Sequence, residues 1–234
     1  MTKPSPSPDE GMNRYLKRAE QMAAERRRAW QEARARRFDT VAAHGLYSVT
    51  SALDDYAGAV MEPLFLSSSQ AYRDSDEMEA ALSYRIPTWC YTRIHNPTLG
   101  FLEDVLALLE SYGSDEEVSC CSYSSGMAAI EGATNALLAG PADGPLNFVA
   151  TCQVYGGTFQ QFNIRKMAER GIEVRWIRDS NDIDEWARKI DKNTRFLYGE
   201  LPSNPGLSFF DLARVIALAH EHRLPMVVDS TIAS

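Results

Sequence analysis

The second half of the sequence alternates between two kinds of segment. Short apolar runs rich in β-branched and aromatic residues have the composition of buried strands, and the stretches between them repeat apolar residues with a helical period. The pattern predicts strands over 116–122, 146–151, 172–178, 194–201 and 224–230, and helices over 97–113, 124–140, 157–171, 181–190 and 209–223. Such alternation is typical of the α/β class, with a mainly parallel sheet flanked by helices. Ligands of these sheets bind at the carboxyl ends of the strands.

The first part of the chain lacks this regularity. Residues 1–9 are rich in Pro and Ser, which predicts a disordered tail. Residues 10–37 carry nine Lys or Arg against four Glu in a helix-forming composition, and extended segments and turns follow. We therefore expect an N-terminal helix and extended arm over 10–96, and an α/β domain over 97–234 that is incomplete. The helix is expected to pack on a neighbouring subunit, with a nucleic-acid patch as the alternative.

Composition argues against several classes of protein. The net charge of −8 argues against general nucleic-acid binding. The sequence has no apolar run of about eighteen residues that would span a membrane, and "MTKPSPSPDEG" lacks the apolar stretch of a signal peptide. The cysteines, at positions 90, 120, 121 and 152, show neither metal-ligand spacing nor a disulfide framework. We expect reduced thiols, no metal, and a cytoplasmic protein.

Polar and aromatic residues follow several of the predicted strands. Ser125, Gly126 and Met127 form a small turn that leads into a helix, where free backbone N–H groups favour a phosphate; a plain helix cap is the alternative. Tyr155 precedes two glycines and can place its ring over the crevice, or be an ordinary half-buried aromatic. Asn204 lies between two prolines and presents its amide, or is a turn residue.

A carboxylate, Asp229, closes the last predicted strand. Its charge is costly there unless it meets a cation or several donors. It could cap a following helix, bind a metal or pair with a protonated ring nitrogen; a metal is disfavoured because no His or second acid lies nearby. Taken together, the strand ends supply a phosphate cradle, an aromatic wall, an amide and an acid. A flat, phosphorylated, basic heteroaromatic compound fits all four.

Five stretches, over roughly residues 85–234, resemble one known family. They are "YTRIHNPTLGFLEDVLALLE", "SSGMAAI", "VYGGTFQQF", "ELPSNP" and "PMVVDST". In order and spacing they are similar to the Cys/Met-metabolism family of enzymes dependent on pyridoxal 5′-phosphate (PLP). Its members include cystathionine γ-synthase, cystathionine lyases, methionine γ-lyase and O-acylhomoserine sulfhydrylases. The resemblance implies the fold of the fold-type I PLP-dependent transferases and PLP as cofactor.

The resemblance also implies roles for individual residues. The amides of Gly126 and Met127 would hold the cofactor phosphate, and Asp229 would keep the ring nitrogen protonated. Tyr155 would stack on the ring and exchange a proton near the substrate. The implied catalytic residues are Tyr155 and Asp229, and the implied cofactor-binding residues are Tyr91, Arg93, Ser125, Gly126, Met127, Tyr155, Asn204, Asp229 and Thr231. Tyr91 and Arg93 would reach in from a neighbouring subunit, so the resemblance implies a homodimer or homotetramer with shared sites.

The family's Schiff-base lysine lies beyond the position of this aspartate. The lysines of the sequence are Lys3, Lys17, Lys166, Lys189 and Lys192, and all precede Asp229. We therefore expect a fragment of a longer enzyme, or one half of a split enzyme, inactive by itself.

The expected reaction of the complete enzyme is γ-elimination or γ-replacement on an O-activated homoserine or a cystathionine-like amino acid. Gly157 departs from the methionine γ-lyase pattern, and His95 could alter substrate choice or be a surface histidine. The alternatives are a β-lyase acting on cystathionine or cysteine conjugates, a non-catalytic or split-chain partner that keeps the PLP fold, and a different type I PLP enzyme.

Overall fold

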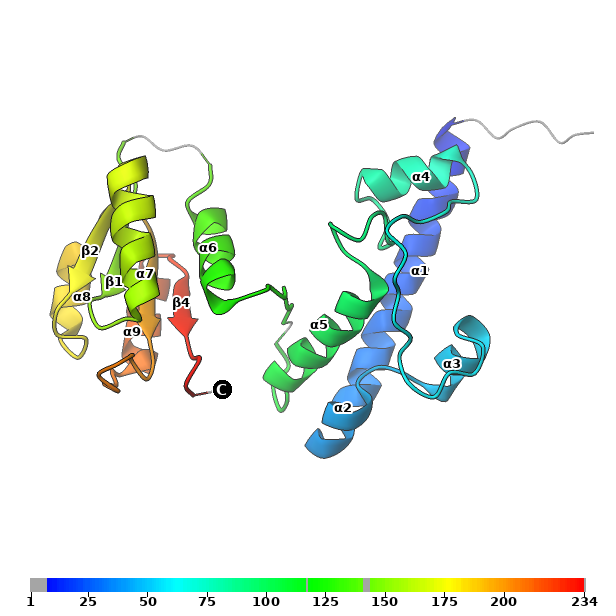
Figure 1. Cartoon of the computed structure of the whole chain (residues 1–234), viewed down its shortest axis with the longest axis horizontal. Helices are drawn as coiled ribbons and strands as arrows, with labels where there is room; N and C mark the ends of the chain where they lie inside the picture. The colour runs from blue at the N-terminus through cyan, green and yellow to red at the C-terminus, as the bar shows by residue number, and fades with distance from the viewer. Residues whose placement is uncertain (1–7, 117, 141–143, 234) are drawn as a thin grey trace, which may run out of the picture. The chain divides into compact units, whose positions relative to one another are not determined.

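The computed structural model describes residues 8–116, 118–140 and 144–233, with the backbone alone for residues 8–11. The chain forms two compact units, one ending at Ser122 and the other beginning at Tyr123 (Figure 1). Most of the predicted tail over 1–9 lies outside the described residues, whereas Pro8 and Asp9 belong to the first helix.

The first unit is helical. Its helices are α1 (Pro8–Arg34), α2 (Phe38–His44), α3 (Val49–Asp55), α4 (Ser75–Leu82) and α5 (Pro97–Glu110). The α1 helix packs along α4 and α5 of its own unit: the Tyr15 hydroxyl donates to Asp74 at 2.9 Å, and Ala33 is buried beside Leu108. Among the described residues, no helix combines the length and apolar character needed to cross a membrane.

The arm after α1 is less extended than the sequence pattern predicts, because it contains α2, α3 and α4. Two of these short helices have side-chain caps. The Ser48 hydroxyl accepts the N–H of Ser51 at 3.1 Å, and the Asp74 carboxylate accepts the N–H of Glu77 at 2.9 Å. Helices of this length are marginal in isolation, so packing within the unit decides whether they form. A purely periodic reading of the sequence misses them.

The second unit is built around a parallel sheet (Figure 1). Its strands are β1 (Asn147–Thr151), β2 (Glu173–Ile177), β3 (Thr194–Glu200) and β4 (Met226–Asp229), in the spatial order β2-β1-β3-β4. Its helices are α6 (Gly126–Leu137), α7 (Gly156–Gln160), the π-helix η1 (Gln161–Ala168), α8 (Ile183–Lys189) and α9 (Leu212–Glu221). The predicted α/β class and parallel sheet are confirmed.

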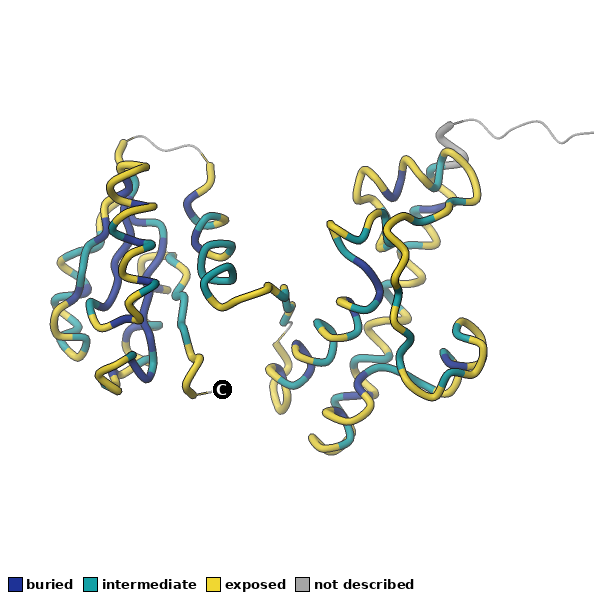
Figure 2. Tube along the Cα trace, viewed as in Figure 1, coloured by how far each residue is buried: buried dark blue, intermediate teal, exposed yellow. Residues whose placement is uncertain are grey.

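Both faces of this sheet are covered, and its central strands β1 and β3 are more buried than the edge strands β2 and β4 (Figure 2). On β1, Phe148 belongs to the core shared with α6 and η1, whereas Val149 belongs to the core shared with α8 and α9. On β3, Phe196 and Leu197 divide in the same way, and the rings of Phe148 and Phe196 stack with centroids 4.5 Å apart. Strands buried on both faces read as continuous apolar runs, which is why the sequence located them.

The strand predicted over 116–122 is wrong for the residues described there, which are 116 and 118–122. Side chains of the first unit bind this segment. The guanidinium of Arg34 donates to the carbonyl of Glu116 at 2.6 Å, and the Glu103 carboxylate accepts the N–H of Ser122 at 2.8 Å. Polar side chains therefore satisfy backbone groups that a strand would pair with a neighbouring strand.

One charged side chain is fully buried between α6 and η1. The Lys166 ammonium lies 2.9 Å from a Glu131 carboxylate oxygen and donates to the Asn135 carbonyl at 2.6 Å. Burial lowers the pKa of Lys166, and the Glu131 carboxylate opposes this change. At Glu131, burial favours a higher pKa, but hydrogen bonds from Lys166 and Asn135 outweigh it and lower the pKa. The pair is a charged contact between two helices that cover one face of the sheet.

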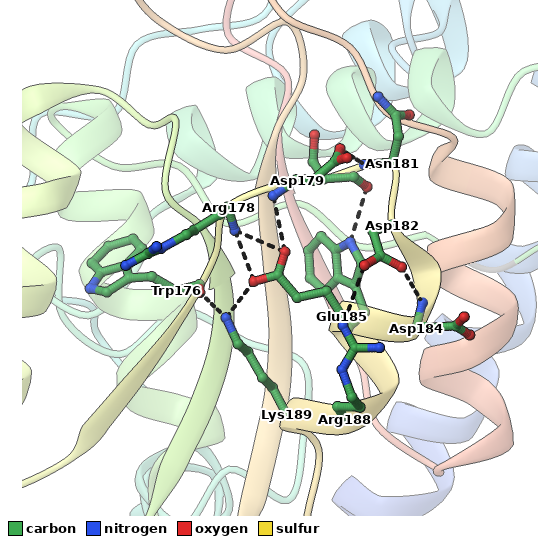
Figure 3. Close-up of polar contacts among 11 residues, drawn as sticks. Trp176, Arg178, Asp179, Asn181, Asp182, Asp184, Glu185, Arg188 and Lys189 are labelled. Carbon is green, nitrogen blue, oxygen red and sulfur yellow. Dashed lines mark hydrogen bonds and ion pairs between the residues drawn. The ribbon is translucent and has the colours of Figure 1, made fainter.

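A second polar cluster links the end of β2 to α8 (Figure 3). The Glu185 carboxylate accepts the N–H groups of Arg178 at 3.1 Å and Asp179 at 3.0 Å, and the Lys189 ammonium at 2.5 Å. Burial works to raise the pKa of Glu185, but these donors outweigh it and lower the pKa from 4.5 to about 2. The folded state therefore binds this proton more weakly than the unfolded state does.

We expect Glu185 to contribute stability that is complete above pH 4.5 and is lost as the pH falls toward about 2. Glu185→Gln should lower the melting temperature at pH 7. Between pH 5 and pH 3 the melting temperature of this variant should decrease less than that of the wild type, as measured by thermal unfolding at each pH. Glu169→Gln, which alters an exposed pair with Arg165, is the control and should leave the profile nearly unchanged. Identical profiles for wild type and Glu185→Gln would contradict the assignment.

Candidate functional site

A pocket of about 600 Å³ lies at the carboxyl edge of the sheet in the second unit. It is bordered by the start of α6, the loops after β1 and β3, and the end of β4. Seven of the nine predicted cofactor-binding residues line it: Ser125, Gly126, Met127, Tyr155, Asn204, Asp229 and Thr231. Its volume suits a small organic ligand, and its position is where parallel sheets bind theirs.

The start of α6 supplies free backbone donors. The Ser125 hydroxyl caps the helix by accepting the N–H of Ala128 at 3.2 Å. The amides of Gly126 and Met127 have no acceptor among the described residues, and a Cβ added at Gly126 would meet nothing within 4 Å. The turn is thus a helix cap that leaves two N–H groups unpaired at the border of the pocket. An anion is stabilised at such a helix N-terminus.

The carboxylate of Asp229 is bound more closely at one oxygen than at the other. Its Oδ1 atom accepts the N–H of Thr231 at 3.1 Å and the Thr231 hydroxyl at 2.6 Å. Its Oδ2 atom has a longer contact, 3.5 Å, with the hydroxyl of Tyr198. Burial and then the charge of Asp229 raise the pKa of Tyr198, so this phenol stays protonated. The site therefore presents an oriented carboxylate with acceptor capacity to spare, which suits a cationic N–H group.

Sequence reasoning missed Glu200 at the end of β3, which also lines the pocket. Its side chain is buried, and its two oxygens accept the N–H groups of Tyr155 at 2.7 Å and Asn204 at 2.6 Å. Burial raises the pKa of Glu200, the two N–H donors oppose this, and the nearby charge of Asp229 adds to it. The signal was a charge at the end of an apolar strand, the same signal that drew attention to Asp229.

The sequence model described as "Cys/Met metabolism PLP-dependent enzyme" matches residues 40–234. The chain belongs to this family. The α1 helix precedes the matched region.

The chain is also similar to individual members of this PLP-dependent family. It is 33% identical to a homocysteine/cysteine synthase of Kluyveromyces lactis, over 83% of this chain and 40% of that protein. It is 30% identical to an O-acetyl-L-homoserine sulfhydrylase of Corynebacterium glutamicum, over 84% of this chain and 42% of that protein. The chain thus spans less than half the length of these relatives.

Two solved structures share the fold at 27% sequence identity. A putative O-acetylhomoserine (thiol)-lyase of Campylobacter jejuni, solved with N′-pyridoxyl-lysine-5′-monophosphate, has a TM-score of 0.70 over 83% of this chain and 44% of that one. A cystathionine γ-lyase of Lactobacillus plantarum, complexed with L-serine, has a TM-score of 0.68 over 85% of this chain and 46% of that one.

The residues of the pocket fit the cofactor of this PLP-dependent family. Two unpaired amides at the start of α6 match a phosphate, and the spare oxygen of Asp229 matches a ring nitrogen. The Tyr155 side chain borders the space between them and is 48% exposed. A Cβ at Gly157 would lie 2.6 Å from the Tyr155 ring and 3.1 Å from the Met127 sulfur. Any larger residue at position 157 would therefore displace the aromatic wall.

Tyr91 and Arg93 are not among the residues that line this pocket, and they belong to the first unit. Both are exposed there. Tyr91 forms a single antiparallel bridge with Ser69, and the guanidinium of Arg93 lies 5.3 Å from the centre of the Tyr91 ring. That Tyr91 and Arg93 reach the site of a neighbouring subunit stays a prediction.

No lysine lines the pocket among the residues that the structure describes. Lys166 is engaged with Glu131 and Lys189 with Glu185, whereas Lys3 lies outside the described residues. No group of three or more His, Cys, Asp or Glu residues in the described part is placed to hold a metal ion. All four cysteines are free thiols.

Proposed function

We propose that the pocket holds PLP and belongs to an enzyme that carries out γ-elimination or γ-replacement on an O-activated homoserine or a cystathionine-like amino acid. One observation carries the proposal. Two unpaired helix amides, at Gly126 and Met127, and a carboxylate with a spare oxygen, at Asp229, border one pocket of about 600 Å³. These are complementary groups for the phosphate and the ring nitrogen of one small molecule.

In this proposal each residue has a defined role. Gly126 and Met127 bind the phosphate through their N–H groups, and the negative charge of Asp229 keeps the ring nitrogen protonated. When bound, the cofactor supplies an electron sink for negative charge at the α-carbon of an amino acid. Tyr155 covers the ring and holds or moves a proton at its phenolic oxygen, and the Asn204 amide donates a hydrogen bond beside the substrate. Thr231 holds the carboxylate of Asp229 in place.

Between the two reactions, the relatives favour γ-replacement. Those reported above include a homocysteine/cysteine synthase and an O-acetyl-L-homoserine sulfhydrylase, whose names indicate that sulfur is introduced. The substrate we propose is accordingly an O-activated homoserine, with a thiol or sulfide as the incoming nucleophile. Elimination from a cystathionine-like substrate is the second candidate, supported by the likeness to a cystathionine γ-lyase.

We propose that a lysine and a cationic side chain for the substrate carboxylate join the site from residues outside this sequence. The chain spans less than half of its relatives, and no described lysine lines the pocket. These residues belong either to the same polypeptide or to a second one that completes a split enzyme. A non-catalytic protein that retains the pocket is the alternative. We place the protein in the cytoplasm, in keeping with its free thiols.

The binding test uses pyridoxamine 5′-phosphate, which has the ring and phosphate of PLP but no aldehyde, so it cannot bond covalently to surface lysines. Calorimetric titration of the chain should show saturable binding at one site, with inorganic phosphate as a weak competitor. Gly126→Pro, which removes one phosphate N–H, should weaken binding, and Gly144→Pro, outside the pocket, should not. Absence of saturable binding by the wild-type chain would overturn the proposal.

We further propose that Arg93 reaches the pocket of a second copy of the chain. Arg93→Ala and Asp229→Asn should each abolish tight binding of pyridoxamine phosphate. When the two variants are co-expressed as dimers with random assortment, about a quarter of the sites regain binding, because one site of each mixed dimer carries neither defect.

Arg85→Ala alters an exposed arginine of the same arm and serves as the matched control; alone it should bind normally. Mixed oligomers that recover no binding would show that Arg93 does not act across subunits.

A further inference from the structure

Glu200 joins two loops that carry residues of the candidate site. One carboxylate oxygen accepts the N–H of Tyr155, in the loop after β1, at 2.7 Å. The other accepts the N–H of Asn204, in the loop after β3, at 2.6 Å. Tyr155 is 45 residues from Glu200 in the sequence, and Asn204 is 4 residues from it. This one side chain therefore links two segments that are distant in the sequence.

The environment makes this contact costly to replace. Glu200 is only 5% exposed, so its carboxylate has exchanged water for these two donors. An ionised carboxylate has two acceptor oxygens and no donor, so it can accept both N–H groups at once. An amide at the same place would accept one N–H and direct its own N–H₂ group against the other.

Glu200 also lies directly beside Asp229, its register partner on the adjacent strand β4. The two carboxylates stand at the carboxyl edge of the sheet but differ in their partners. Glu200 has both oxygens bound to loop amides, whereas Asp229 keeps acceptor capacity on Oδ2. The two acids at neighbouring strand ends therefore differ in what they bind. Glu200 binds the loop amides, whereas Asp229 can still accept a hydrogen bond from a ligand.

We propose that Glu200 is a positioning residue of the site, whose carboxylate holds the Tyr155 ring and the Asn204 amide at the pocket through their backbone N–H groups. The effect on ligand binding rests on the proposed function; the effect on the loops does not. Gln153 provides a second link, because its side-chain oxygen accepts from the hydroxyls of Ser203 and Ser208 in the β3 loop.

The chain offers a matched control in Glu185. This carboxylate also accepts two loop N–H groups, those of Arg178 and Asp179, just past the end of β2 (Figure 3). It does not line the pocket. Glu200→Gln and Glu185→Gln therefore remove the same kind of contact, one beside the site and one away from it.

The test measures amide hydrogen exchange and ligand binding on the wild-type protein and on each variant. In Glu200→Gln the amides of Tyr155 and Asn204 should exchange about tenfold faster or more, with those of Arg178 and Asp179 unchanged. Glu185→Gln should show the reverse. Affinity for pyridoxamine 5′-phosphate should fall about tenfold in Glu200→Gln and stay at the wild-type value in Glu185→Gln. Glu200→Asp, which retains a carboxylate, should recover part of both properties and replaces Glu200→Gln if that variant does not fold.

The outcomes separate this inference from the proposed function. Unchanged exchange at Tyr155 and Asn204 in Glu200→Gln would overturn the positioning role, and so would an equal loss of affinity in both glutamine variants. Wild-type protein that binds no pyridoxamine phosphate, with the predicted exchange pattern intact, would overturn the proposed function and leave the loop-positioning role standing.

Discussion

Asp229→Asn is expected to lower kcat by about 10²- to 10³-fold in the complete enzyme, which includes the family's Schiff-base lysine. The substitution keeps the shape of the side chain and its contacts with Thr231, so the fold should be preserved. It removes the negative charge that would keep the ring nitrogen of the cofactor protonated. The measurement is steady-state kinetics with an O-activated homoserine, together with thermal unfolding of each protein.

Asp211→Asn is the matched control for this prediction. Asp211 caps α9 by accepting the N–H of Arg214 at 3.1 Å, does not line the pocket, and is replaced by another good capping residue. It should leave both kinetics and stability near the wild-type values. An Asp229→Asn enzyme with undiminished kcat would refute the proposed pairing with the cofactor.

Lys166→Met is expected to have the largest effect on stability, a loss of about 3 kcal/mol in the free energy of unfolding. Lys166 is fully buried, and its ammonium lies 2.9 Å from Glu131 and 2.6 Å from the Asn135 carbonyl oxygen. Methionine fills similar space but removes the ammonium that contacts the Glu131 carboxylate. We place the effect at the lower end for broken buried pairs because the Glu131 side chain is 36% exposed and gains some hydration. Urea unfolding measures the change.

Two further variants identify the cause. Lys192→Met changes an exposed lysine and should alter stability by less than about 0.5 kcal/mol. Glu131→Gln combined with Lys166→Met removes both charges and should recover a large part of the loss, which a double-mutant cycle quantifies. If Lys166→Met were as stable as the wild type, the ion pair would have no structural importance.

The sheet could be predicted closely because its central strands, β1 and β3, are buried on both faces. Each of β1 to β4 falls within its predicted range, and alternation with helical segments correctly indicated parallel pairing. The segment 116–122 has a similar short apolar pattern but no strand among its described residues, since Arg34 and Glu103 bind its backbone. Local composition cannot reveal such distant partners.

Seven of the residues that line the pocket could also be anticipated, in part for a topological reason. In a parallel sheet the residues just after the strands gather at one edge, so Tyr155, Asn204 and Asp229 were expected together despite their separation in sequence. Glu200 was missed because its importance comes from two backbone N–H groups on different loops. In the sequence, Lys166 is notable only as a lysine that precedes Asp229 and so does not match the family's Schiff-base lysine. Its contacts in the structure make it a buried structural cation.

The sequence by itself determined the α/β class, the places of the strands and membership of the PLP-dependent family, because apolar periodicity and linked motifs are local properties of the chain. Tertiary structure alone decided which polar groups are satisfied and which stay open to a ligand. Hydrogen-bond partners such as Glu200 with Tyr155, or Lys166 with Glu131, are set by folding that brings distant residues within about 3 Å.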